Sequence, residues 1–373
     1  MDLPSLYQKQ ISLSEWFANI NHKETENFRE EDNWKRERMD ELSQFITFPF
    51  DKPTSFSASD VVNRSEEFEK FLSERGNEYC ALRLIPILPE LPKLRMRGMT
   101  IADAVHSWLP EQNIEAGNYQ ADFVPHPNDH IWSSIFVVNK HGVIGEMVAD
   151  SHNILTQGFH ENFDIVNFTY DFATNILKTS TQDENAEEHV LELLSYIRVT
   201  DENLRQAISE KFAVEFVGGE YLPGYFESVK SSDFGTWFID WNRVLGKMYD
   251  DVWSPITENF ENDTLSGKVG SPGVAQGIVR IIHPDKISTG EFNDGDILLC
   301  LMTSPDYVPL MKRAGAVITQ EGGILSHAAI VSREMGVTCL VGVKGVLDKL
   351  QEGDLVEVNA NEGVIKILEK KKK

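Results

Sequence analysis

The stretch that decides the fold is Gly315-Ala-Val-Ile-Thr-Gln-Glu-Gly-Gly-Ile-Leu-Ser-His-Ala-Ala-Ile-Val-Ser-Arg-Glu-Met-Gly336. Its apolar start predicts a strand, Gly322 and Gly323 predict a tight turn, and the residues after Ser326 predict a helix. Ser326 stands where a hydroxyl caps a helix, so His327 falls in the first helical turn. Free backbone N–H groups and the positive end of the helix dipole favour an anion at this position.

The residue types of this stretch suit a phosphoryl group. Neutral imidazole is a good nucleophile near pH 7, and its phosphoramidate stays reactive enough to pass the phosphoryl group onward. Glycines let the backbone approach a phosphate closely, where bulkier residues would not. A glycine turn before a capped amphipathic helix is also a common way of starting a helix. From the residues alone, His327 therefore has either a chemical or a purely structural role.

Residues 322–336, GGILSHAAIVSREMG, resemble the phosphohistidine signature of phosphoenolpyruvate synthase, pyruvate phosphate dikinase and rifampicin phosphotransferase. The resemblance extends over residues 265–368, with VGSPGVAQGIVRII like the opening strands and Met302–Asp306 like a substrate-side loop. It implies a swivelling β/β/α domain in which His327 carries the phosphoryl group. The residues that the resemblance places around the phosphate are Thr319, Gly322, Gly323, Ser326 and Arg333.

The rest of the chain divides by composition into two further parts. Residues 1–78 are polar and charged, with apolar residues at roughly helical spacing, and predict an acidic helical N-terminal segment. Residues 79–264 mix strand-like and helical runs. Residues 265–373 form the third part, which ends in a basic tail. The expected fold class is α/β multidomain.

A phosphohistidine needs a phosphoryl donor, and the sequence has neither a GxxxxGK[ST] loop nor a Rossmann GxGxxG turn. Residues 79–264 resemble an abbreviated version of the ATP-grasp-like α+β domain of the same enzymes. Ala81-Leu-Arg83 is similar to the strand whose arginine contacts the nucleotide, and Lys93, Arg95 and Arg97 could add positive charge. Gly145 and Glu146 fall where that family has a GLGE-like turn.

The segment from Tyr225 to Arg243 resembles the paired strands in which a glutamate, a glutamine and an arginine meet metal and ATP. The resemblance gives Glu227 the glutamate position and Arg243 the arginine position, while Trp241 replaces the glutamine. It implies nucleotide binding by Arg83, Glu227 and Arg243. It also implies Mg²⁺ or Mn²⁺ binding by Glu227, Asp240 and Asn242, because carboxylates and carbonyl oxygens coordinate such ions. ATP would be a substrate.

Charge and cysteine usage limit the partners. Lys and Arg number 35 against 59 Asp and Glu, a formal net charge of −24, which argues against nucleic acid or an anionic membrane as partner. The three cysteines form no CxxC pair, as expected of a reducing compartment. With no apolar run of about 18 residues and no secretory start, we expect a cytoplasmic protein.

The expected function is a phosphotransferase of the phosphoenolpyruvate synthase and dikinase type, in which His327 passes a phosphoryl group from ATP or phosphoenolpyruvate to an acceptor. The pyruvate-binding barrel of those enzymes does not follow residue 373, so we expect a small-molecule acceptor site within residues 1–265 or a partner subunit that carries it. Two alternatives stay open. One is a phosphocarrier subunit of a split enzyme that binds no nucleotide, and the other is a regulatory, non-catalytic homologue.

Overall fold

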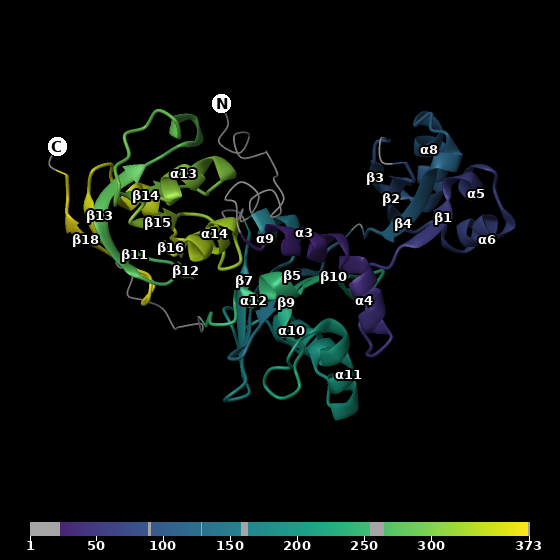
Figure 1. Ribbon diagram of the computed structural model, residues 1–373, viewed down its shortest axis with the longest axis horizontal. Helices are drawn as coiled ribbons and strands as arrows, with labels where there is room; N and C mark the ends of the chain where they lie inside the picture. Colours follow the sequence, from purple (N-terminus) through teal and green to yellow (C-terminus); the bar gives the residue numbers. More distant parts are fainter. Residues whose placement is uncertain (1–22, 89–90, 128, 158–162, 254–264, 372–373) are drawn as a thin grey trace. The chain divides into compact units, whose positions relative to one another are not determined.

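A computed structural model describes residues 23–88, 91–127, 129–157, 163–253 and 265–371 (Figure 1). Parts of the predicted N-terminal segment, of the junction near residue 265 and of the basic tail lie outside the described residues. The described residues form three sheets. The chain divides into two compact units, one of residues 36–131 and 229–239 and the other of the remaining residues. The predicted α/β multidomain architecture is confirmed; its exact boundaries stay predictions.

The smaller unit is built on an antiparallel sheet of order β1-β4-β2-β3 (Figure 1). One face carries Leu82, Leu84 and Phe123, which form a core with the helices. Alternation along the strands places Arg83, Arg95 and Asp122 on the other face, which also carries Ala81 and Val124. The strands are β1 (Thr54–Ser57), β2 (Tyr79–Pro86), β3 (Leu94–Thr100) and β4 (Tyr119–Pro125); the helices are α5 (Ala58–Val62), α6 (Glu66–Arg75), α7 (Ile101–Asp103), the π-helical turn Ala104–Trp108 and α8 (Leu109–Glu111).

The segment before residue 78 contains helices, as predicted, and also strand β1. Helices α3 (Thr25–Asn33) and α4 (Lys35–Ser43) bury Phe28, Met39 and Leu42. Trp34, another of the apolar residues at this roughly helical spacing, is 63% exposed. The apolar spacing therefore marks the helices but not every residue of their buried side.

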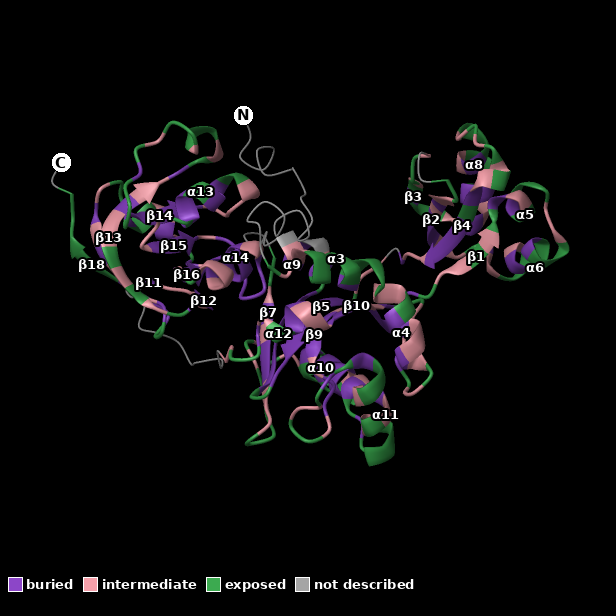
Figure 2. Cartoon of the chain, in the orientation of Figure 1, coloured by how far each residue is buried: buried purple, intermediate pink, exposed green. Residues whose placement is uncertain are grey.

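The six-stranded sheet has the order β10-β9-β5-β6-β7-β8. Its central strands β5 and β6 are buried along their whole length (Figure 2). Phe136, Phe168 and Phe226 pack on one face, whereas Ile135, Val137 and Ile144 belong to a core on the other. The strands are β5 (Trp132–Val138), β6 (Gly142–Val148), β7 (Val166–Asp171), β8 (Ile176–Thr179), β9 (Gly224–Ser231) and β10 (Gly235–Asn242); the helices are α9 (Asn153–Gln157), α10 (Glu184–Ile197), α11 (Glu202–Phe212) and α12 (Arg243–Lys247).

The C-terminal sheet has the order β11-β18-β17-β13-β14-β15-β16-β12, and its four strands β13 to β16 are parallel. Because side chains alternate along these strands, the sheet has a core on each face. Helix α14 packs on the face that carries Leu298 and Val317, where it contributes Ala328, Ala329 and Val331 to the core. The strands are β11 (Leu265–Ser266), β12 (Lys268–Ser271), β13 (Val274–Ile281), β14 (Ile297–Cys300), β15 (Ala316–Thr319), β16 (Thr338–Val341), β17 (Leu355–Asn359) and β18 (Val364–Glu369); the helices are the 3₁₀ turns Pro284–Lys286 and Pro305–Tyr307, α13 (Val308–Met311), α14 (His327–Met335) and α15 (Val346–Lys349).

Candidate functional site

The turn between β15 and α14 places His327 at the first residue of the helix. Thr319 at the end of β15 donates its hydroxyl to the Glu321 carbonyl at 2.6 Å, which closes the start of the turn. Gly322 has φ +108°, a conformation that side-chain-bearing residues rarely adopt. The predicted strand, turn and helix are therefore all present, and the glycine is required by the backbone.

Ser326 occupies the N-cap position of α14 with an extended backbone. Its hydroxyl does not make the predicted hydrogen bond to the helix, because Oγ is directed back toward Gly322. Ser326 is buried, and within the described part of the chain Oγ has no hydrogen-bond partner. A buried hydroxyl without a hydrogen-bond partner lowers the stability of the fold. The Ser326 hydroxyl is therefore suited to donate a hydrogen bond to an anion at the turn.

His327 is half-buried, and the burial of its ring lowers the pKa to about 4 from an ordinary value of 6.5. The cause is desolvation, which disfavours the imidazolium form. The ring is therefore neutral at pH 7 and keeps a nucleophilic nitrogen lone pair.

Arg333 lies two helical turns further along α14 and is not directed to the glycine turn. Its guanidinium donates to the Gly270 carbonyl at 2.5 Å and lies 4.3 Å from the centre of the Tyr249 ring. This placement differs from the predicted phosphate contact. The reason is geometric: six residues of helix separate Arg333 from His327 by about 9 Å along the axis.

The predicted metal-binding carboxylates lie beside a lysine that the sequence did not point to. Lys35 Nζ is 4.0 Å from Asp240 Oδ2, and Lys35 also opposes the rise of the Glu227 pKa. Burial is the main reason that the Glu227 pKa is raised, and the Tyr225 hydroxyl donates to Glu227 at 2.8 Å. Among the residues that the structure describes, no group of three or more His, Cys, Asp or Glu could hold a metal ion.

Two predicted ligands have structural partners instead. Arg243 forms a two-pronged ion pair with buried Glu31, at 2.9 Å and 2.7 Å, and donates to the Phe212 carbonyl. The side-chain oxygen of Asn242 accepts from Leu245 N at 2.8 Å and caps α12. The predicted nucleotide role of Arg243 and metal role of Asn242 therefore do not fit this conformation, because the same groups stabilise α12 and its contact with α3.

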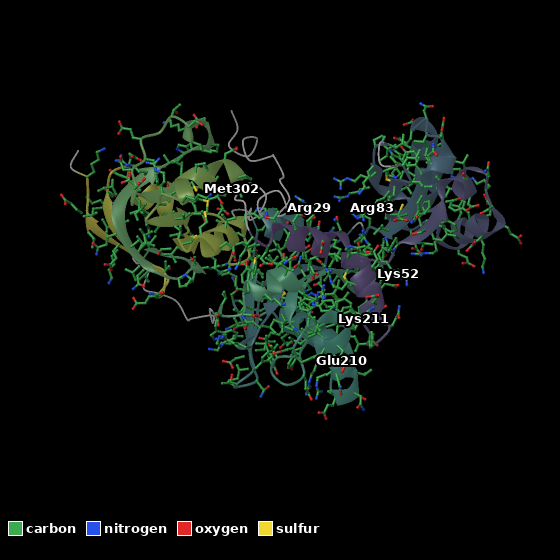
Figure 3. The ribbon with its side chains drawn as sticks, viewed as in Figure 1. Arg29, Lys52, Arg83, Glu210, Lys211 and Met302 are labelled. Atoms are coloured by element: carbon green, nitrogen blue, oxygen red, sulfur yellow. The ribbon has the colours of Figure 1, made fainter. Side chains whose placement is uncertain are left out.

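Arg83 belongs to the smaller unit (Figure 3), where it lies on β2 on the face of the four-stranded sheet opposite the core of Leu82 and Leu84. It is directly opposite Arg95 on β3 and Asp122 on β4. Burial, and next the neighbouring Arg36, lower the Arg83 pKa to about 10, and burial also lowers that of Arg97. Arginines gathered on one face make a surface that favours anions.

A cavity of about 650 Å³ lies between α3, α12 and the end of α14. This size is within the range of small-molecule sites, about 300–1,000 Å³. The helix that starts at His327 reaches the cavity through Glu334. Its other lining residues include Glu30, Trp34, Arg243, Lys247 and Met248.

Residues 292–363 match the family described as PEP-utilising enzyme, mobile domain. The C-terminal part of this chain, which contains the glycine turn and His327, therefore belongs to that domain family. The chain is 39% identical over 157 residues to the phosphoenolpyruvate synthase of Pyrococcus furiosus, a match that covers 40% of this chain and 19% of that protein. It is 43% identical over 101 residues to the phosphoenolpyruvate synthase of Aeropyrum pernix, covering 27% of this chain and 12% of the other.

An uncharacterized phosphotransferase of Bacillus subtilis, YvkC, is 39% identical over 126 residues, which cover 34% of this chain and 14% of that protein. The chain thus spans less than a fifth of the length of these curated relatives. The predicted kinship with phosphoenolpyruvate-utilising enzymes is confirmed for the C-terminal domain.

Two solved structures are also similar to this chain. The D-cycloserine synthetase DcsG matches 57% of this chain and 62% of its own, with 10% identity and a TM-score of 0.28. The ATP-grasp ligase PsnB, complexed with minimal precursor, Mg and ADP, matches 55% of this chain and 46% of its own, with 8% identity and a TM-score of 0.23. Separately, none of the helices in the described ranges is long and apolar enough to cross a membrane.

Proposed function

We propose that this chain is a phosphotransferase in which His327 carries a phosphoryl group from a donor to an acceptor. In the loading step a ring nitrogen attacks phosphorus, an N–P bond forms, and the bond from phosphorus to the leaving oxygen of the donor breaks. The ring N–H proton passes to solvent. The observation that carries the proposal is the position of His327 at a helix start, beside a buried Ser326 hydroxyl directed into the glycine turn.

ATP with Mg²⁺ or Mn²⁺ is the donor that we favour, with phosphoenolpyruvate as the other. Within the smaller unit, Arg83 and Arg95 lie directly opposite each other on β2 and β3 and support binding of a polyphosphate. Within the larger unit taken by itself, Glu227 and Asp240 would hold a metal ion after Lys35 moves away, because carboxylates are suitable ligands for Mg²⁺. The ATP-grasp-like character of residues 79–264 is part of this proposal.

The acceptor is a small molecule or a partner subunit, and nucleic acid and membranes are not proposed as partners. For a small molecule, the cavity between α3, α12 and the end of α14 is our candidate site because of its size. A reducing, cytoplasmic setting is proposed from the cysteines: all three are free and buried.

A phosphocarrier without its own nucleotide site is the second candidate. It is favoured by the ion pair of Arg243 with Glu31 and by the use of Asn242 as a helix cap. A regulatory homologue that transfers nothing is the third. It would leave the buried Ser326 hydroxyl without a chemical purpose.

The test is to incubate the purified chain with Mg²⁺ and either γ-labelled ATP, β-labelled ATP or labelled phosphoenolpyruvate, and to measure acid-labile, alkali-stable phosphate. His327→Ala should abolish the label, and His283→Ala, an exposed histidine of the same domain, should keep it. Label from ATP supports the nucleotide site. Label from phosphoenolpyruvate alone, or only with a partner protein, supports the carrier. A His327→Ala chain that labels as well as the wild type refutes the proposal.

A further inference from the structure

Glu146 places its carboxylate against the glycine turn that precedes His327. It lies on β6 in the middle of the six-stranded sheet and is 1% exposed. A Cβ atom at Gly323 would lie 1.8 Å from Glu146 Oε2 and 2.4 Å from Oε1. Heavy atoms do not approach so closely, so only glycine admits the carboxylate at this position.

Lys268 on β12 neutralises this buried carboxylate. Its Nζ is 2.5 Å from Glu146 Oε1, and its side chain is 28% exposed. A buried carboxylate is stable only with a partner, since an unpaired charge in the interior is strongly disfavoured. The ion pair therefore joins the sheet of Glu146 to the C-terminal domain beside the turn.

Apolar contacts hold the same turn against the sheet. Ile324 and Leu325 of the turn pack in one core with Ile135 and Ile144 of the sheet. The Tyr249 hydroxyl donates to the Ile324 carbonyl at 3.3 Å. The turn that would receive a phosphoryl group is therefore closed off by side chains of the larger unit.

The position of the carboxylate is informative because the turn and the start of α14 form a place that favours an anion. Here the anion is a side chain of the protein itself. A phosphoryl group on His327 would bring about two negative charges to the start of the helix. That start lies four residues after Gly323, against which the buried Glu146 carboxylate lies. Like charges in a poorly hydrated place repel strongly, so both anions would not remain there together.

We propose that Glu146, held by Lys268, is an internal anion that occupies the glycine turn while His327 is unphosphorylated, and that this contact and the phosphohistidine exclude each other. Phosphorylation then releases the turn from the sheet, and loss of the phosphoryl group lets the contact form again. The inference rests on the proposed function in one respect, that His327 is the residue phosphorylated. It does not depend on which donor the chain uses.

The experiment uses phosphoramidate, a small donor that needs no nucleotide site. The ring nitrogen attacks phosphorus, the P–N bond of the reagent breaks, and ammonia leaves. Full-length wild type, Glu146→Gln and Lys268→Met are incubated with the reagent, and the phosphorylated fraction of the peptide containing His327 is followed by mass spectrometry. Lys366→Met is the matched control, because Lys366 pairs with Glu357 at 3.7 Å on the exposed part of the same domain.

Both variants of the pair should be phosphorylated at least about tenfold faster than wild type, a change that corresponds to about 1.4 kcal/mol. The control should stay within about twofold. Gly323→Ala gives a second test, since the added methyl group displaces the Glu146 carboxylate without changing the charge of that carboxylate. In this variant the backbone amides of residues 323–325 should exchange hydrogen faster than in the wild type. Thermal melting shows whether each variant is folded.

Three results would overturn the inference. One is a folded Glu146→Gln chain that reacts at the wild-type rate. Another is unchanged hydrogen exchange of the turn after wild-type His327 has been phosphorylated. The third is the absence of phosphorylation at His327 in every variant. Failure of the proposed function looks different: phosphoramidate modifies His327 with the expected differences, but neither ATP nor phosphoenolpyruvate labels the chain.

Discussion

Lowering the pH from 7 to 5 should leave the nucleophilic form of His327 almost intact. With a pKa of about 4, roughly nine-tenths of the ring is neutral at pH 5. A free histidine with a pKa near 6.5 is about three-quarters neutral at pH 7 and only about 3% neutral at pH 5. Its reactivity therefore falls about 25-fold over this interval, whereas that of His327 should fall by less than about twofold.

The assay is modification by diethyl pyrocarbonate, measured by mass spectrometry at both pH values with acetylhistidine in the same tube. The ratio of the two reaction rates removes the effect of pH on the reagent. A parallel fall in the reaction rates of His327 and acetylhistidine would refute the reasoning, because it would mean that the ring is not desolvated.

The same pKa shift changes the stability of the fold in a defined direction. The folded pKa is below the unfolded one, so stability is lost as pH falls from about 6.5 to about 4, and His327→Asn should lose that dependence.

Three further changes test other parts of the structure. Arg243→Ala leaves buried Glu31 without its ion pair and should lower the free energy of unfolding in urea by about 3–5 kcal/mol. The control, Arg313→Ala at an exposed arginine, should change this free energy by less than about 1 kcal/mol. Equal effects of the two substitutions would contradict the buried ion pair. Gly322→Ala, at φ +108°, should cost about 1–3 kcal/mol in the same assay, and a neutral result would mean that the turn relaxes easily. Arg83→Ala should weaken ATP binding in calorimetry at least about tenfold, corresponding to about 1.4 kcal/mol, and unchanged binding would remove the arginine face from the proposal.

The sequence was most informative where a local pattern determines local structure. The run from Gly315 to Gly336 predicted a strand, a turn and a helix, and the structure has them as β15, the glycine turn and α14. Apolar residues alternate or recur at fixed intervals in such elements, so neighbours along the chain suffice to predict them. The position of His327 at the helix start follows from the same pattern.

The parts that could not be predicted depend on residues far apart in the chain. Lys35 meets Asp240, Lys268 meets Glu146, and Glu31 meets Arg243. A single lysine or glutamate in a polar segment looks like a solvated residue, and nothing in its neighbours shows which distant carboxylate or cation it will meet. In this conformation Arg243 pairs with the distant Glu31, and Asn242 caps the helix that follows it, so their nucleotide and metal roles stay predictions.

Two of these unforeseen contacts share one property. In each, a charged group of the chain occupies a place where the proposed reaction would put a ligand. Lys35 stands beside Glu227 and Asp240, where a metal ion would lie, and Glu146 stands at the turn, where a phosphoryl group would lie. Both substitutes carry the sign of charge of the ligand that they replace. A cation beside carboxylates and an anion at a glycine turn balance the charge of these two places. Under the proposed function, loading either site would require displacing a side chain of like charge, which would couple donor binding and release of the turn to movement of Lys35 and Glu146.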